Sequence, residues 1–110
     1  MLDGEYQCLS AELLDNIAEK LEFLDGNGDL ELEYYDGVIT ITLKSGKQIL
    51  INKHSASQQI WFSSPINGGM RFSYNNDLSK WKLENGKELL TTLSAELEEI
   101  AGIEVELGEK

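Results

Sequence analysis

The stretch DGNGDLELEYYDGVITITL, residues 25–43, decides the fold, because the spacing of its apolar side chains changes there from a helical to a strand period. Residues 25–28 form a turn signal, since glycine tolerates backbone conformations that other residues resist. Apolar and polar residues then alternate over residues 29–35, which indicates a strand. Asp36 and Gly37 predict a tight turn before a second alternating run at residues 38–43. The stretch therefore predicts a helix end followed by an antiparallel hairpin.

The segment before residue 25 has the period of an amphipathic helix, expected from residue 5 to residue 24. Apolar side chains recur there every three or four positions, as in a helix that packs one face against a core. They are Tyr6, Leu9, Leu13, Ile17, Leu21 and Leu24. Asp3 is the candidate N-cap of this helix, because a carboxylate there can accept a hydrogen bond from the first turn.

Short alternating runs separated by turn signals continue after the hairpin. The expected strands are residues 48–53, 58–64, 70–75 and 80–83. A second helical stripe follows, ended by Gly102, and residues 103–107 are expected as a short extended tail. The stripe consists of Leu89, Leu90, Leu93, Leu97 and Ile100. We predict an α+β fold of order α-β-β-β-β-β-β-α, a two-layer α/β sandwich with both helices on one face of an antiparallel sheet.

Size and composition predict one domain spanning residues 1–110. No segment resembles a targeting peptide or a membrane span, so we expect a soluble, cytoplasmic protein. Cys8 is the only cysteine, so no disulfide within the chain is expected. From its neighbours at the helix start, Cys8 is interpreted as a partly buried packing residue.

Charge is divided unevenly along the chain, whose formal net charge is −11. Residues 1–36 contain eleven acidic side chains and one lysine, whereas residues 37–87 contain two acids and seven bases. A concentration of negative charge attracts cations and basic proteins and repels phosphate backbones and anionic lipid. The composition therefore argues against nucleic acid and membranes as partners.

Glu12, Asp15, Glu19 and Glu22 form a second stripe on the predicted first helix, facing away from the core. One interpretation is a solvated helix face. The other is a surface whose mutually repelling carboxylates gain when a hydrated cation or a basic protein screens them. Oxygen ligands suit hard cations, and without histidine or cysteine ligands such a site selects poorly among metals.

The run QQIWFSS, residues 58–64, is expected to turn Ile60 and Phe62 toward the core and Trp61 toward the opposite face. A register shift of one residue would bury Trp61 but expose the other two apolar side chains, which is less favourable. We therefore expect an exposed Trp61, whose large apolar area suits a binding contact.

The sequence argues against a calcium-binding loop, a histidine-based metal site and the common catalytic motifs. Residues 25–36 begin like a calcium-binding EF-hand loop, but Leu30 stands where glycine is required and Asp36 where glutamate is required. His54, the only histidine, is expected in a solvent-exposed turn with no second nitrogen or sulfur ligand nearby in sequence. Glycine-rich phosphate loops, nucleophile elbows and zincin helices are absent from the sequence.

The segment ILINKHSASQQIWFSSP, residues 49–65, closely resembles the central signature of the frataxin family. Its most specific part is INK at residues 51–53, followed by QIW at residues 59–61 and SSP at residues 63–65. The acidic first helix and the order of elements also resemble those of bacterial frataxins, over nearly the whole chain. The resemblance implies an α/β sandwich that binds iron weakly, as Fe²⁺ or Fe³⁺, at an acidic ridge. It also implies work in iron–sulfur cluster assembly beside a cysteine desulfurase and a scaffold protein.

The resemblance implies two sets of site residues. The metal-binding ridge would consist of Glu12, Asp15, Glu19, Glu22, Asp25, Asp29, Glu31 and Glu33. Ala18, Phe23 and Asn27 stand where bacterial members more often have acids, which leaves the number of bound ions open. The partner-binding face would consist of Asn52, Gln59, Trp61 and Arg71, the last resembling a basic residue of eukaryotic members.

Three classes of function follow from these features. The favoured one is a monomeric binding and regulatory module that carries Fe²⁺, with an iron-dependent oligomer left open. Its ridge would dock on the desulfurase and its Trp61 face on the scaffold. A ferroxidase-type enzyme is the alternative, for which buried paired carboxylates with histidines would be expected. An acidic decoy for a nucleic-acid-binding protein fits the charge but leaves Trp61 unexplained.

Overall fold

The computed structural model describes residues 1–107 and has its elements in the predicted order. They are α1 (Asp3–Gly26), β1 (Leu30–Tyr35), β2 (Val38–Leu43), β3 (Gln48–His54), β4 (Gln59–Ser64), β5 (Gly68–Asn75), β6 (Lys80–Lys82) and α2 (Leu89–Ala101). The predicted boundaries of α1 and of the strands agree with these to within two residues. The tail after α2, expected to be extended, has no regular secondary structure over residues 102–107.

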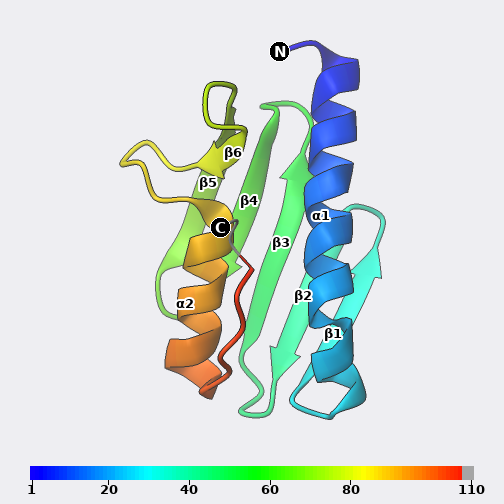
Figure 1. Cartoon of the computed structure of the whole chain (residues 1–110), viewed down its shortest axis with the longest axis vertical. Coiled ribbons are helices and arrows are strands. Elements are labelled where there is room, and N and C mark those ends of the chain that lie inside the picture. The colour runs from blue at the N-terminus through cyan, green and yellow to red at the C-terminus, as the bar shows by residue number, and fades with distance from the viewer. Residues whose placement is uncertain (108–110) are drawn as a thin grey trace.

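The strands form one antiparallel sheet in which each strand pairs with its neighbours in sequence, in the order β1-β2-β3-β4-β5-β6. Both helices lie on the same face of this sheet (Figure 1). The predicted two-layer sandwich is therefore confirmed. Within the described residues, no helix covers the other face of the sheet.

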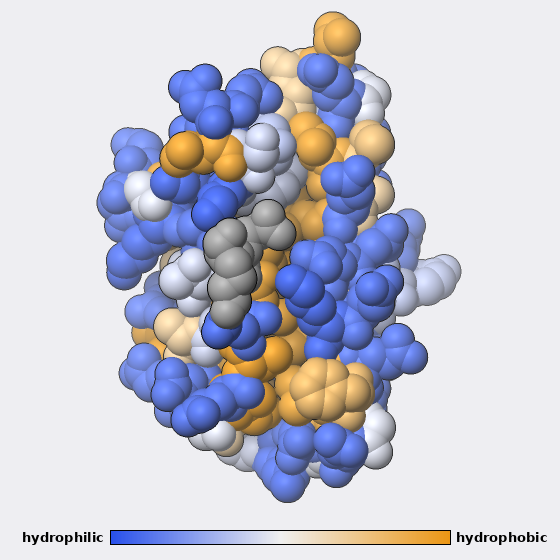
Figure 2. Space-filling model, viewed as in Figure 1, coloured by the Kyte–Doolittle hydropathy of each residue, from blue (hydrophilic) through white to orange (hydrophobic). Residues whose placement is uncertain are grey.

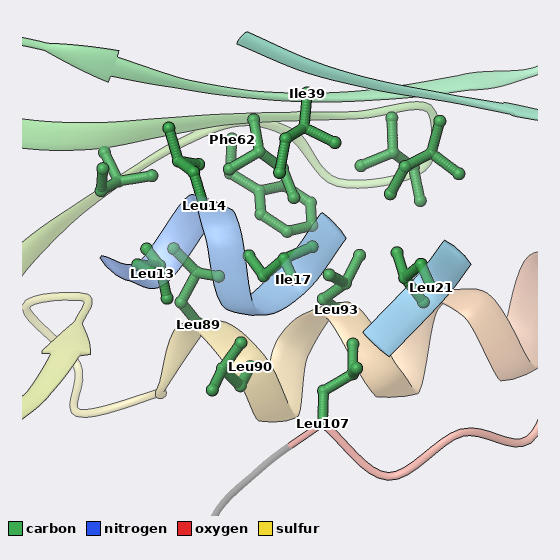
Figure 3. Packing of buried hydrophobic residues seen from close by; sticks show 14 of the residues in the cluster. Leu13, Leu14, Ile17, Leu21, Ile39, Phe62, Leu89, Leu90, Leu93 and Leu107 are labelled. Atoms are coloured by element: carbon green, nitrogen blue, oxygen red, sulfur yellow. The ribbon is translucent and has the colours of Figure 1, made fainter. Parts of the chain in front are cut away.

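The hydrophobic core lies between the helices and the sheet. Every second side chain of a strand points into it, because successive side chains point to opposite faces of a sheet. Ile39, Ile41, Ile60 and Phe62 are almost fully buried on the strands. Figure 3 shows leucines of α1 and α2 pointing toward Ile39 and Phe62 of the sheet. The register predicted for β4 is therefore confirmed, because Ile60 and Phe62, rather than Trp61, face the core.

Helix α1 begins earlier than predicted, and its N-cap is Leu2. The prediction of Asp3 as N-cap was wrong, because Asp3 already belongs to the first turn. The carboxylate of Glu5 accepts a hydrogen bond from the Leu2 backbone N–H at 3.2 Å, which stabilises the start of the helix instead. Leu14 is also buried, so the buried stripe is wider than the predicted one.

Helix α2 is capped at both ends. The side chain of Glu88 accepts hydrogen bonds from the backbone N–H groups of Leu90 and Thr91 at 3.0 and 3.1 Å. Gly102 ends the helix in the left-handed conformation with a φ of 67°, as its position predicted. No helix within residues 1–107 is long and apolar enough to cross a membrane.

The tail after α2 closes the seam between the two helices (Figure 1). Leu107 is fully buried in the core cluster. Its backbone N–H donates to Ser94 Oγ at 3.2 Å, and its carbonyl accepts from Lys20 Nζ at 3.3 Å. Figure 2 shows apolar side chains in this seam, with mostly hydrophilic ones on either side of it.

Candidate acidic ridge and sheet-face site

The predicted partner-binding residues lie together on the uncovered face of the sheet. Register places Asn52 of β3 opposite Trp61 of β4, and Trp61 opposite Arg71 of β5. These residues therefore form one row across three strands. Gln59 lies beside the row, where its Oε1 accepts from Trp61 Nε1 at 3.4 Å and its Nε2 donates to Ser73 Oγ at 3.2 Å.

Trp61 is half-buried, which corrects the prediction of an exposed ring. The imidazole of His54 stacks on the indole with centroids 3.9 Å apart and planes 8° from parallel. The Arg71 guanidinium carbon lies over the same ring, 4.9 Å from its centroid. His54 and Arg71 come from the strands on either side of β4, and both contact the indole. Trp61 is thus held in one orientation before any partner arrives.

The surroundings of His54 and Cys8 also differ from their predictions. His54 ends β3 instead of lying in a turn, is half-buried, and its Nδ1 is 2.7 Å from Ser57 Oγ. Cys8 is exposed instead of partly buried. The stripe that faces the core passes through Tyr6 and Ser10, which leaves Cys8 on the outer surface of α1.

The acidic ridge of α1 faces solvent as predicted. Glu12, Asp15, Glu19, Glu22 and Asp25 are all exposed and lie along one side of the helix. Asp29 follows in the turn before β1 and is half-buried. Exposed carboxylates at this spacing repel one another, and they hold a region of negative potential along α1.

Tyr34 of β1 joins the ridge, and sequence reasoning did not include it. Its hydroxyl donates a 2.7 Å hydrogen bond to Asp15 Oδ1. Burial, and then the hydrogen bond and negative charge of Asp15, raise the pKa of Tyr34 to about 12. The two residues are 19 positions apart in sequence. Only the packing of α1 against β1 brings them together, so no local pattern predicts the contact.

Asp25 binds the edge of the sheet through its side chain. Its Oδ2 accepts a hydrogen bond from the backbone N–H of Leu32 at 3.2 Å. Because β1 is an edge strand, this N–H points away from β2 and would otherwise lack a partner in the sheet. Asp25 is therefore both a predicted metal ligand and a structural acceptor.

Glu31 and Glu33 lie on a different surface from the acids of α1. They alternate with Leu30 and Leu32, which face the helices, and they pair with Thr42 and Thr40 of β2. Strand alternation therefore places both glutamates on the uncovered face of the sheet. The eight predicted metal ligands form two adjacent acidic surfaces, one on α1 and the following turn, the other at the β1 edge.

The acids do not form a preorganised metal centre. Within residues 1–107, no three His, Cys, Asp or Glu side chains converge on one point that could hold an ion. A cation at this ridge would meet one or two carboxylates and keep much of its water, as hard cations do at exposed oxygen sites. Such geometry supplies charge without strong selectivity.

The fold and these two surfaces define a class of protein: an α/β sandwich with an acidic helix on one side and an aromatic, partly basic sheet face on the other. The model of the frataxin-like domain matches residues 1–103, and the chain belongs to the frataxin family. The iron–sulfur cluster assembly protein CyaY of Pseudomonas fluorescens is 31% identical over 101 residues, which cover 89% of this chain and 91% of that protein. CyaY of Thioalkalivibrio sulfidiphilus is 30% identical over 91 residues, covering 83% and 84%.

Solved structures show the same fold. Frataxin of Psychromonas ingrahamii superposes with a TM-score of 0.85 at 27% identity, covering 99% of this chain and 100% of that one. Trimeric yeast frataxin in complex with ferrous iron superposes with a TM-score of 0.75 at 28% identity, covering 86% and 87%. The family resemblance of residues 49–65 is therefore confirmed.

Proposed function

We propose that this protein is an iron-binding regulator, or iron chaperone, of iron–sulfur cluster assembly. The observation that carries the proposal is the pairing of two surfaces, the exposed acids of α1 and the row Asn52–Trp61–Arg71 on the sheet. Relatives are named as assembly proteins, and a yeast relative is described with ferrous iron. These names support the assignment of iron as cargo and of cluster assembly as the process.

Iron would bind weakly at the ridge. Glu12, Glu19 and Glu22 are exposed and have no hydrogen-bonded partner in residues 1–107, so they can meet a hydrated Fe²⁺ without losing an existing contact. Asp15 and Asp25 would first have to give up or share the hydrogen bonds from Tyr34 and Leu32. The free acids of α1 are therefore the first sites that we expect iron to occupy.

The protein partners would use the two surfaces differently. A basic surface of a cysteine desulfurase suits the acids of α1, where clustered charge raises the rate of encounter. A scaffold protein suits the Trp61 row, where an oriented aromatic ring offers apolar area at low entropic cost. We expect a cytoplasmic protein that is monomeric without iron.

Ferroxidase activity is the weaker proposal. Oxidation of Fe²⁺ by a protein site is favoured by buried carboxylates paired with histidines around adjacent ions. The acids here are exposed and spread over two surfaces, and His54 is stacked on Trp61 on the sheet face. This arrangement supports binding and transfer more than catalysis.

A titration with Fe²⁺ under anaerobic conditions, followed by amide NMR, tests the iron proposal. We expect shifts and broadening at residues 12–25 first, and overlapping effects with Mn²⁺ and Co²⁺ because carboxylates alone discriminate little. A tight iron site centred on His54 would contradict the proposal.

Charge reversal tests the desulfurase proposal. The variant Glu19→Lys with Glu22→Lys should lose binding to the cysteine desulfurase in a pull-down or titration assay. Glu98→Lys with Glu99→Lys is the matched control, since both glutamates are exposed on α2 and the change in net charge is identical. Equal loss in both variants would show that net charge, and not the ridge, determines binding.

A further inference from the structure

A hollow of about 640 Å³ opens at the basic end of the uncovered sheet face. It lies between β4, β5, β6 and the turn that follows β6. Among its lining residues are Gln59, Arg71, Ser73, Lys82 and Glu84. Gln59 and Arg71 belong to the predicted partner face, whereas Ser73, Lys82 and Glu84 have had no role so far.

Two cationic side chains line this hollow without an ion pair. Lys82 of β6 pairs with Ser73 of β5, and Arg71 lies two residues before Ser73 on the same face of the same strand. Side chains in this diagonal relation lie roughly 7–8 Å apart. Within residues 1–107, neither Arg71 nor Lys82 forms an ion pair with a carboxylate, although Glu84 stands at the rim. The hollow therefore has positive groups whose charge is not neutralised.

The orientation of Arg71 leaves its hydrogen-bond donors available. The Arg71 guanidinium carbon lies over the Trp61 ring at 4.9 Å from its centroid, and within residues 1–107 this guanidinium donates no hydrogen bond. The paired N–H groups of a guanidinium match the two oxygens of a carboxylate. Ser73 adds a hydroxyl, which accepts from Gln59 Nε2 and keeps its own hydrogen to donate.

We propose that this hollow receives a carboxylate side chain of a protein partner that docks on the sheet face. The proposal rests on the proposed function only for the presence of such a partner. A carboxylate is favoured over a phosphate group because Glu84 at the rim offsets one of the two positive charges of Arg71 and Lys82. About one positive charge is then left to balance the anion, and the net charge of −11 repels a dianion more strongly than a monoanion. The same charges argue against an anionic lipid surface.

The position of the hollow also sets the direction of docking. Glu31 and Glu33 lie at the β1 edge of the same face, four strands away from Arg71 of β5. A complementary partner therefore places an acidic residue over β5 and β6, and basic residues over β1. A partner rotated by 180° in the plane of the sheet would bring like charges together at both ends of the interface.

The small-anion test uses this protein alone, so its result does not depend on iron or on any desulfurase. Sodium acetate is added to ¹⁵N-labelled protein at constant ionic strength, with sodium chloride and sodium phosphate as parallel arms. We expect saturable shifts of the Arg71 Nε–H and of the backbone amides of Ser73 and Lys82, with an affinity on the order of tens of millimolar. Equal shifts with chloride, or stronger binding of phosphate, would overturn the proposal.

Three variants and one control locate the site. Arg71→Gln and Lys82→Gln should each weaken acetate binding about threefold or more, because each removes one charge-assisted contact. Glu84→Gln should strengthen it, because a competing carboxylate leaves the rim. Lys44→Gln is the matched control: it also removes one exposed positive charge, but at the turn after β2, far from the hollow. Unchanged binding in all three variants, or equal weakening by Lys44→Gln, would show that the hollow is not the site.

Discussion

The hydroxyl of Tyr34 donates a 2.7 Å hydrogen bond to the Asp15 carboxylate, which ties the β1 edge to the acidic side of α1. Burial first, and Asp15 second, raise the pKa of Tyr34 from 10.0 to about 12. The neutral phenol is therefore favoured in the folded protein. Its contribution to stability is complete below pH 10 and is lost as the pH rises through about 12.

Replacing Tyr34 by Phe should remove this loss of folding stability at alkaline pH. We expect the free energy of unfolding of Tyr34→Phe to fall less steeply than that of the parent between pH 10 and 12. Chemical denaturation at a series of pH values gives the two curves. Their difference is the readout, because Tyr6, whose pKa is also raised by burial, contributes equally to both. Parallel curves would show that Tyr34 does not titrate differently in the folded protein.

Asp15→Asn separates the two causes of the Tyr34 shift. Without the carboxylate, the pKa of Tyr34 should fall, yet it should stay above 10.0 because burial is the larger cause. The absorbance of the phenolate measures this titration. A pKa at or below the ordinary value in Asp15→Asn would mean that Asp15 alone sets it.

Trp61→Ala should cost about 1–2 kcal/mol of folding stability, because the ring is half-buried between His54 and Arg71 on the face outside the core. Phe62→Ala, one residue further along β4, removes a ring that is 1% exposed and should cost about 3–5 kcal/mol. Urea denaturation compares the two variants. If Trp61→Ala cost as much as Phe62→Ala, the indole would have a core role that the sheet register does not show.

Asp25→Ala should destabilise the protein by about 1 kcal/mol, because the Leu32 N–H loses its acceptor at an otherwise open sheet edge. Glu22→Ala is the control, since Glu22 is an exposed acid on the same helix without a hydrogen-bonded partner in residues 1–107. Removing Glu22 should leave stability unchanged or raise it slightly by relieving repulsion. Hydrogen exchange at Leu32 should accelerate only in Asp25→Ala, and protection that survived there would argue against the contact.

Asn67→Ala should cost about 1–3 kcal/mol, because it leaves a buried carboxylate without a hydrogen bond. Glu96 of α2 is 3% exposed, and its Oε2 accepts from Asn67 Nδ2 at 2.7 Å. Its Oε1 has no hydrogen-bond partner in the part of the chain that the structure describes. Asn76→Ala, in the exposed turn after β5, is the control and should have little effect. Equal melting temperatures for both variants would contradict this assignment.

Patterns with a fixed local period predicted most of the fold. The alternation of β2 and β4 fixed which side chains face the core, and Gly102 marked the end of α2, because each depends on neighbours within a few residues. The N-cap at Leu2 was missed because, by residue type, Asp3 is a much better N-cap candidate than leucine. Which of two adjacent residues begins a helix depends on contacts that local preference does not determine.

The candidate site was only partly predictable for the same physical reason. Exposure of the α1 acids follows from helical spacing, and the row of Asn52, Trp61 and Arg71 follows from strand register. The contacts Asp15–Tyr34 and His54–Trp61 depend on how side chains meet after the elements have packed. Part of the half-burial of Trp61 could have been anticipated, since the register places Asn52 and the long side chain of Arg71 directly beside it.

The order of the sheet has a consequence for the speed of folding. Every strand pairs with its neighbour along the chain, so the whole sheet can form by successive short hairpins, each closing only a small loop at low entropic cost. The Tyr6 hydroxyl and the Gln59 carbonyl are 53 residues apart. Their contact closes a much longer loop at a higher entropic cost, so we expect it to form later. We therefore expect a transition state in which the central hairpins are formed and α1 is not yet docked. Mutations at Ile51 or Ile60 should then slow refolding, whereas Tyr6→Phe should mainly accelerate unfolding.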